Sequence, residues 1–374
     1  MKHILSLSFI FCLFTLKAEA QQLSNPNATV LTEALYQNLH QLSKNYTLFG
    51  HQDDLAYGVG WKYIPNKSDI KDVVNDYPAI YGWDISKIEH NAANNIDGVP
   101  FNKMRKYIID GYQRGAVITI SWHFDNPLTG GSSWDTTRNT VKSILPGGEK
   151  HALFKTWLDR AANFLHSLKG SKGEAIPVLF RPFHELTGNW FWWGSHATTP
   201  EQMKQIWQFT ADYLRKTKKL NQLILVYNTN DFKTEADFLR SYPGDDYVDV
   251  LSFDTYQFDL AKKQDFINEI KRQSAIVTKL AAEKKKLAAF AETGFENLPD
   301  PDWWTGTLWP AIKDYPLSYV LVWRNAGYMP STQKMHYYAP HKGQASEKDF
   351  VKFYQNKKIL FEKNLSSKKI YQTK

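Results

Sequence analysis

Two glutamates stand in sequence contexts that suit acid–base chemistry. Glu185 follows an apolar run at residues 176–180 and precedes the aromatic stretch 190–193, and Glu292 follows the small apolar run 287–291. A carboxyl group that is desolvated among apolar side chains has a raised pKa, as a general acid requires. One such glutamate alone is more often a loop carboxylate or half of a buried ion pair. The repetition of the pattern favours a catalytic pair.

Short apolar stretches alternate with longer amphipathic stretches along residues 21–374. We expect strands at 47–51, 79–84, 116–123, 176–185, 223–228, 248–256, 287–292 and 318–324, and helices at 101–114, 151–168, 200–217, 262–283 and 348–364. Such alternation implies parallel strands with crossover helices, and eight units close a barrel. The sequence therefore predicts an α/β protein, a (β/α)8 TIM barrel that forms a single domain.

On this fold, chemistry takes place at the carboxyl ends of the strands. Polar and aromatic residues end most of the predicted strands, namely His51, Trp83, His123, His184, Glu185, Asp254, Tyr256, Glu292, Trp323 and Arg324. A single His or Trp at such a place is usually a packed residue, but several together favour a substrate cleft. If the two glutamates end the fourth and seventh strands, they face each other across the barrel mouth. Two opposed acids with aromatic faces for pyranose rings suit glycoside hydrolysis, with retention at a carboxyl separation of about 5 to 5.5 Å.

At these residues the chain resembles the glycoside hydrolase family 26 β-mannanases. The motifs are Arg-Pro-Phe-His-Glu (181–185), Gly-Asn-Trp-Phe-Trp-Trp-Gly (188–194) and Glu-Thr-Gly (292–294), with further similar segments at 50–52, 82–84, 121–123, 252–256 and 322–325. The resemblance implies a retaining endo-β-1,4-mannanase that acts on mannan, galactomannan or glucomannan. It also implies a monomer without cofactor or metal.

The resemblance also implies roles for individual residues. Glu185 would be the acid/base and Glu292 the nucleophile, and Tyr256 would orient Glu292. Trp190 would lie beside the reacting sugar, and His184 replaces an asparagine that binds the 2-OH in related families, which suits the axial 2-OH of mannose. The remaining expected substrate-binding residues are His123, Asp254, Trp323, Arg324, His51 and Trp83. Trp323 and Arg324 would contact the sugar one site further toward the non-reducing end.

Three other functions stay open on the sequence. One is another β-glycanase of the same superfamily, of the cellulase, lichenase or β-1,3-xylanase type, and another is a non-catalytic glycan-binding protein. The third is a metal-dependent barrel hydrolase, but its usual His-x-His pair on the first strand is absent. Its candidate ligands would be His51, Asp53, Asp54, His123, Asp125 and His184.

The first twenty residues predict a signal peptide. A short apolar run at 4–16 follows Lys2, and Ala18 and Ala20 fit a cleavage site, so residues 1–20 are assigned to export and 21–374 to the catalytic domain. The expected location is the periplasm or the medium. Cys12, the single cysteine, lies in this segment, which excludes a thiol nucleophile in the mature chain.

The composition excludes two further classes of function. The formal charge is +8, but lysines fall in helix-like stretches and no nucleic-acid-binding motif is present. After the signal peptide, no stretch is apolar for long enough to span a membrane. The partner that the resemblance implies is a β-mannan chain. We expect the long connection at 127–148 to wall one end of the cleft and favour mannobiose and other short products.

Overall fold

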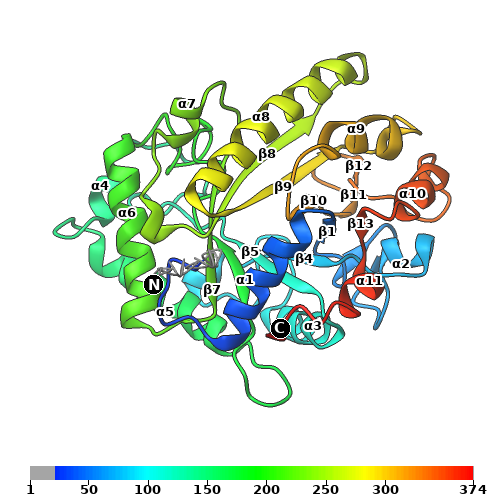
Figure 1. Ribbon diagram of the computed structural model, residues 1–374. Coiled ribbons are helices and arrows are strands. Elements are labelled where there is room, and N and C mark those ends of the chain that lie inside the picture. The colour runs from blue at the N-terminus through cyan, green and yellow to red at the C-terminus, as the bar shows by residue number, and fades with distance from the viewer. Residues whose placement is uncertain (1–21, 374) are drawn as a thin grey trace, which may run out of the picture.

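Eight parallel strands close into a barrel in the computed structural model, which describes residues 22–373 (Figure 1). Their order around the barrel is β1, β4, β5, β6, β7, β8, β9 and β10, and pairing of β10 with β1 closes it. The bounds are β1 Thr47–Gln52, β4 Ile80–Asp84, β5 Val117–Ser121, β6 Val178–Arg181, β7 Leu223–Thr229, β8 Val250–Gln257, β9 Leu287–Phe295 and β10 Tyr319–Val322. The predicted TIM barrel is confirmed.

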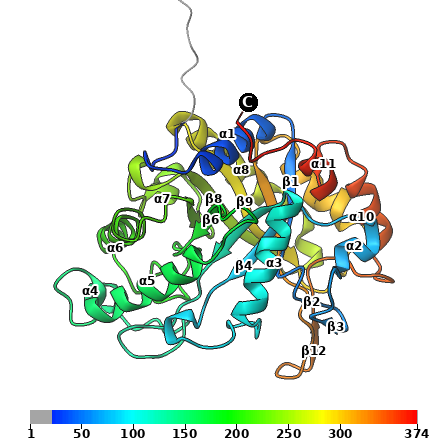
Figure 2. The same cartoon turned by 90° about the horizontal axis from the view of Figure 1, so that it is seen from below.

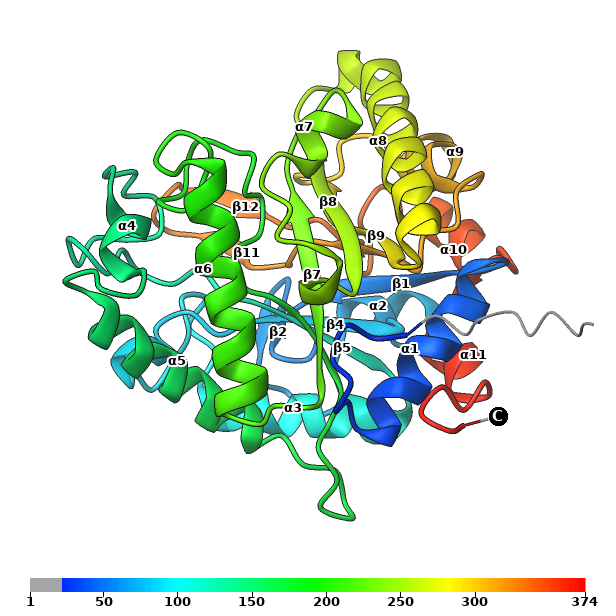
Figure 3. The same ribbon diagram turned by 60° about the vertical axis from the view of Figure 1, so that its left-hand side comes forward.

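Helices cover the outside of this barrel (Figure 3). They are α2 Asp69–Val74, α3 Phe101–Arg114, α4 Thr140–Ile144, α5 His151–His166, α6 Pro200–Asp212, α7 Glu235–Leu239, α8 Lys263–Lys284, α9 Trp309–Ile312, α10 Glu347–Tyr354 and α11 Glu362–Ser366. The predicted helix at 101–114 is confirmed, and those at 151–168 and 262–283 are confirmed within two residues. The helix predicted at 200–217 is α6 followed by a π-helical turn at Tyr213–Thr217.

The single helix predicted at 348–364 is wrong. Between α10 and α11 the chain forms a short strand, β13 (Ile359–Leu360), which pairs with β1. Both of its side chains are buried, and the N–H of Thr47 donates to the carbonyl of Lys358. Ile359 and Leu360 therefore form an extra strand, because β1 has backbone hydrogen-bonding groups free beside Thr47 and Leu48.

Three predicted strands run too far at the catalytic end. β5, β6 and β10 end at Ser121, Arg181 and Val322, so the residues that follow them lie in connecting turns. Pro182 has no N–H to continue the ladder of β6, and Trp122 is buried in a turn where its Nε1 donates to Glu89 at 3.0 Å. Apolar residues in these turns are buried as deeply as strand residues, which is why the apolar pattern does not mark the strand ends.

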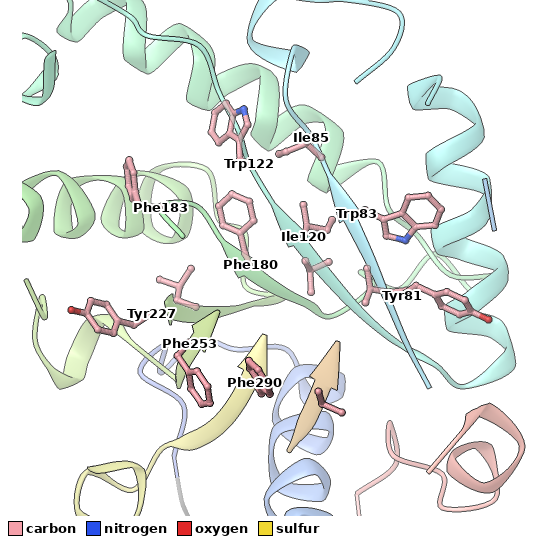
Figure 4. Close-up of a cluster of buried hydrophobic side chains, with 14 of the residues drawn as sticks. Tyr81, Trp83, Ile85, Ile120, Trp122, Phe180, Phe183, Tyr227, Phe253 and Phe290 are labelled. Carbon is pink, nitrogen blue, oxygen red and sulfur yellow. The ribbon is translucent and has the colours of Figure 1, made fainter. Parts of the chain in front are cut away.

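Alternate residues of each barrel strand face two different cores. One set packs outward against the helices, and Figure 4 shows Tyr81, Trp83, Ile120, Phe180 and Phe290 from this layer. The other set fills the barrel interior, for instance Leu48, Ile80, Val117, Leu179 and Leu321.

A helix that the sequence did not predict, α1 (Val30–Ser43), closes the amino end of the barrel. Its Leu35, Tyr36 and Leu39 belong to the same buried cluster as the interior strand residues, and the hydroxyl of Tyr36 donates to the carbonyl of Asp249 at 3.2 Å. Figure 2 shows α1 at the end opposite to the short hairpins β2–β3 (Tyr57–Gly58, Trp61–Lys62) and β11–β12 (Gly327–Met329, Lys334–His336). The carboxyl end of the barrel is thus left for a site. Within residues 22–373, no helix is long and apolar enough to cross a bilayer.

Candidate active site

Glu185 lies in the turn after β6, four residues beyond the strand's last residue, rather than at a strand end as predicted. Its backbone is left-handed, with φ of 51°, and its N–H donates to Oδ1 of Asn228 at 2.7 Å. The indole N–H of Trp190 donates to its Oε2 at 2.8 Å. Burial, followed by the negative charge of Glu292, raises the pKa of Glu185 to about 7. The side chain therefore carries a proton in mildly acidic solution.

Glu292 lies within β9 and is held at both carboxylate oxygens. Oε1 accepts a hydrogen bond from Nη2 of Arg181, and Oε2 accepts one from the hydroxyl of Tyr256 at 3.0 Å. Arg181 also donates through Nη1 to Oδ2 of Asp254 at 2.7 Å, and Asn228 donates to the other oxygen of Asp254 at 2.8 Å. The buried guanidinium thus pairs with two carboxylates and holds Glu292 in place by a charge-assisted hydrogen bond.

The two glutamates are close enough to act on one bond. One carboxylate oxygen from each of Glu185, Asp254 and Glu292 lies within 4.8 Å of the others. This is the short spacing of a pair that reacts from both sides of a glycosidic bond, because an inverting pair must leave room for a water at about 6.5 to 9.5 Å.

Two histidines and an aspartate form a buried chain beside the glutamates. His123 is hydrogen-bonded through Nδ1 to Oδ2 of Asp84 at 2.8 Å, and through Nε2 to Nε2 of His184 at 2.9 Å. Burial alone would lower the pKa of His123, but the Asp84 carboxylate raises it instead. Burial and the neighbouring His123 hold the pKa of His184 well below its usual value. The imidazolium of His123 therefore donates to a neutral His184.

His184 is more deeply buried than His123. Only 1% of His184 is exposed, against 8% of His123, and both His184 nitrogens are buried, one against His123 and one without a partner among the described residues. The contact with the 2-OH predicted for His184 stays a prediction.

Two of the predicted substrate-binding residues are fully buried, and their contact with the substrate stays a prediction. Trp83 points outward from β4 and its ring stacks on Tyr107 of α3, with centroids 5.9 Å apart. His51 is buried and bonded through Nδ1 to Asp54 at 2.7 Å. Because side chains alternate along a strand, the cleft-facing residue of β4 is Asp84, one position after Trp83.

Trp323 and Arg324 lie just after β10, whereas the sequence predicts them as the last residues of that strand. The ring of Trp323 is 6.3 Å from that of His123, and Nη1 of Arg324 pairs with Oδ1 of Asp97 at 2.8 Å. Trp134, half exposed, stacks on His123 at a centroid distance of 5.6 Å and an interplanar angle of 19°. The segment predicted to wall the cleft thus brings an aromatic ring beside His123.

The sequence reasoning missed several residues of the site. Arg181 belongs to the motif at 181–185 and Asn228 ends a predicted strand, but neither was predicted to take part in the site. Asp84 was predicted only as a strand-end residue beside Trp83 and Asp97 was not predicted, yet they hold His123 and Arg324. A polar residue at or just after a barrel strand was the available signal for all of them except Asp97, which lies in a long connection.

The candidate ligands of the metal-dependent alternative do not converge. His51 pairs with Asp54, and His123 with His184. Asp125 accepts from Lys87 at 2.6 Å and is bonded to His90 at 2.9 Å. At Asp254 and Glu292 the positive charge comes from Arg181.

Comparison with known proteins agrees with this geometry. A family model described as glycosyl hydrolase family 26 matches residues 24–297. A mannan endo-1,4-β-mannosidase of Bifidobacterium adolescentis is 30% identical over 90% of this chain, which spans only 35% of that relative's length. One from Bacillus subtilis is 30% identical over 68% of this chain and 73% of its own length. The solved structure of a family 26 β-mannanase from Bacteroides ovatus is 45% identical, with a TM-score of 0.87, over 92% of this chain and 98% of that chain. The protein belongs to glycosyl hydrolase family 26.

Proposed function

We propose that the protein is a retaining endo-β-1,4-mannanase with Glu185 as acid/base and Glu292 as nucleophile. The observation that carries the proposal is the unequal environment of the two acids. Glu292 is paired with a guanidinium and a tyrosine hydroxyl, whereas Glu185 is buried without a cationic partner and has a pKa of about 7. Environments that separate two carboxyl groups in this way assign the acid and the nucleophile.

The reaction then runs in two displacements. In the first, Glu185 donates its proton to the glycosidic oxygen, the bond from that oxygen to C1 breaks, and a carboxylate oxygen of Glu292 forms a bond to C1. In the second, the ionised Glu185 takes a proton from a water molecule, whose oxygen attacks C1 and displaces Glu292. A carboxylate spacing within 4.8 Å supports this course, because no room for water is needed between Glu292 and C1.

The proposed substrate is β-mannan, including galactomannan and glucomannan. Relatives that cover most of this chain carry the name mannan endo-1,4-β-mannosidase. The cleft offers the faces of Trp190, Trp134 and Trp323 for sugar rings, with the buried pair of His123 and His184 beside them. Mannobiose and short oligosaccharides are the expected products, because the loop that carries Trp134 is anchored beside the reacting site by a hydrogen bond from Ser133 to the carbonyl of His123.

A product time course tests the substrate and the mode of attack together. Purified protein is incubated with galactomannan, glucomannan and cellulose, and products are separated at early and late times. We expect rapid loss of viscosity and short oligosaccharides from both mannans and none from cellulose. Equal or faster release from cellulose would move the assignment to another β-glycanase.

Two variants test the roles of the acids. Glu292→Ala should abolish hydrolysis of mannan and of an aryl β-mannobioside alike, because no covalent intermediate forms. Glu185→Ala should lose about 10²- to 10⁴-fold on mannan but far less in the first step on the aryl substrate, whose leaving group needs no proton. Glu201→Ala, an exposed glutamate of α6, is the control. If Glu185→Ala lost as much activity on the aryl substrate as on mannan, the assigned roles would be contradicted.

We further propose that residues 1–20 direct export and that the mature chain begins at Gln21. These residues lie outside the part of the chain that the structure describes. The proposal is supported by the short apolar run and the Ala-Glu-Ala sequence at 18–20. Amino-terminal sequencing of the exported protein tests it, and a first residue other than one near Gln21 would contradict it.

A further inference from the structure

Phe258 is the large apolar side chain most exposed among the described residues of the chain. It is 87% exposed, and it follows β8 directly at the catalytic end of the barrel. A single exposed apolar residue is ordinary on a protein surface. Three features of its surroundings give this one a function.

First, the backbone on both sides of Phe258 is fixed. The side chain of Gln257 accepts from the indole N–H of Trp303 at 2.8 Å and donates to the carbonyl of Asp259 at 3.1 Å. The carboxylate of Asp259 accepts from the N–H of Ala261 at 2.9 Å. The exposed ring is therefore presented from a structured turn, which limits the entropy lost when a ligand stacks on it.

Second, Phe258 is continuous with the reacting centre. Its ring lies 6.4 Å from that of Tyr256, at 38°, and Tyr256 donates to Glu292. The two rings line a groove of about 330 Å³ whose other walls include Asp231, Thr255, Asp265 and Glu269. The carboxylates of this groove are paired with cations, Asp231 and Glu269 with Arg272 and Asp265 with Lys262. The groove thus offers an aromatic face for the apolar face of a pyranose ring and an ionic rim for its hydroxyls.

Third, the groove lies on the side of the leaving group. The proton donor Glu185 follows β6, and the groove residues follow β7 and β8, whereas Arg324 follows β10 on the other side of β9. In a retaining enzyme the acid contacts the oxygen of the leaving sugar. The part of the mannan chain that leaves is thus directed across the ends of β6, β7 and β8, toward Phe258.

We propose that Phe258 is a stacking platform for a sugar of the leaving part of the mannan chain, beyond the sugar next to the scissile bond. The inference rests on the proposed mannanase function and adds the residue that positions the distal end of the substrate. Phe258 makes no contact with the reacting atoms, so its effect is on which bond of a long substrate is cut and how well that substrate binds.

Hydrolysis of mannopentaose in ¹⁸O-labelled water, with mass spectrometry of the products, reads out which bond is cut. Phe258→Ala should lower kcat/KM for mannopentaose by about two- to tenfold, the range expected for one stacking contact. It should also deplete the binding modes that place two or more sugars on the leaving side. An aryl β-mannobioside, which places no sugar there, should be cleaved within twofold of the wild-type rate.

Two further variants keep the test decisive. Leu260→Ala removes a 47%-exposed apolar side chain two residues away, outside the groove lining, and should leave the cleavage pattern unchanged. Phe258→Trp should keep the wild-type pattern because it retains an aromatic face. A wild-type pattern in Phe258→Ala, or equal losses on mannopentaose and the aryl substrate, would overturn the inference. Failure of the wild-type protein to cleave either substrate would instead refute the proposed function.

Discussion

Replacing Glu185 by glutamine should make the stability of the protein less dependent on pH. In the folded protein the pKa of Glu185 is raised from 4.5 to about 7, first by burial and then by the charge of Glu292. The unfolded chain keeps the ordinary value, so between pH 4.5 and 7 the folded state holds a proton that the unfolded state has lost. By linkage, the wild-type stability then falls as the pH rises through this window, and no further change from this group follows above it.

The magnitude follows from the size of the shift. A displacement from 4.5 to about 7 corresponds to on the order of 3 kcal/mol in the free energy of unfolding. Glutamine has nearly the same shape, stays neutral at every pH, and keeps an oxygen to accept from Trp190. The pH-dependent part of the free energy of unfolding should therefore be the same in Glu185→Gln and wild type near pH 4.5. At pH 8 it should favour Glu185→Gln by up to about 3 kcal/mol.

Urea unfolding at a series of pH values from 4.5 to 8.5 measures the difference. Glu149→Gln, at an exposed loop position, is the matched control and should show no trend across this range. In a Glu292→Gln background the gain from Glu185→Gln should shrink, because one cause of the raised pKa has been removed. A difference between Glu185→Gln and wild type that stays constant with pH would refute the assigned environment of Glu185, and with it the acid role.

Four other perturbations have defined outcomes. Tyr256→Phe removes a hydrogen bond to a charged oxygen of Glu292 and should lower kcat about ten- to a hundredfold in steady-state assays without a change in the urea midpoint greater than about 1 M. Asp84→Asn should move the titration midpoint of His123 to lower pH in an NMR experiment, because the carboxylate that raises its pKa is gone, and an unmoved midpoint would contradict this. Leu35→Ala in α1 should cost about 2–5 kcal/mol in urea unfolding while activity per folded molecule is unchanged, since α1 closes the end of the barrel away from the site. Exhaustive chelation should leave hydrolysis at its full rate, and a loss that added metal restores would revive the metal-dependent alternative.

The architecture of the barrel was predictable because each strand and each crossover helix has its apolar pattern within its own stretch of sequence. The stretches at 47–51 and 287–292 are both apolar and short, and both became barrel strands. Helix α1 and strand β13 were not predictable in this way, because their roles depend on the closed barrel. The free edge that β13 pairs with exists only after β1 is in place.

The sequence predicted which strand ends carry the site, but not the direction in which each side chain points. A shift of one position along a strand turns a side chain from the cleft to the outer core, so Trp83 packs on α3 while Asp84 is bonded to His123. The motif that contains His184 does not show that its Nε2 is bonded to Nε2 of His123. Contacts between two strand ends are long-range, and the order of residues along the chain does not record them.

In the proposed mechanism, the same contacts explain how Glu185 can serve first as an acid and then as a base. Arg181 is paired with Asp254 and Glu292, while burial and the charge of Glu292 raise the pKa of Glu185 to about 7 in the free enzyme. When Glu292 forms an ester with the sugar, its negative charge is lost, and one of the two causes that raise the pKa of Glu185 is lost with it. The pKa of Glu185 must then fall, which favours the carboxylate form of this residue when water arrives. The proximity of the two glutamates, which permits attack from both sides of one bond, thus also supplies the change in proton affinity that the second displacement requires.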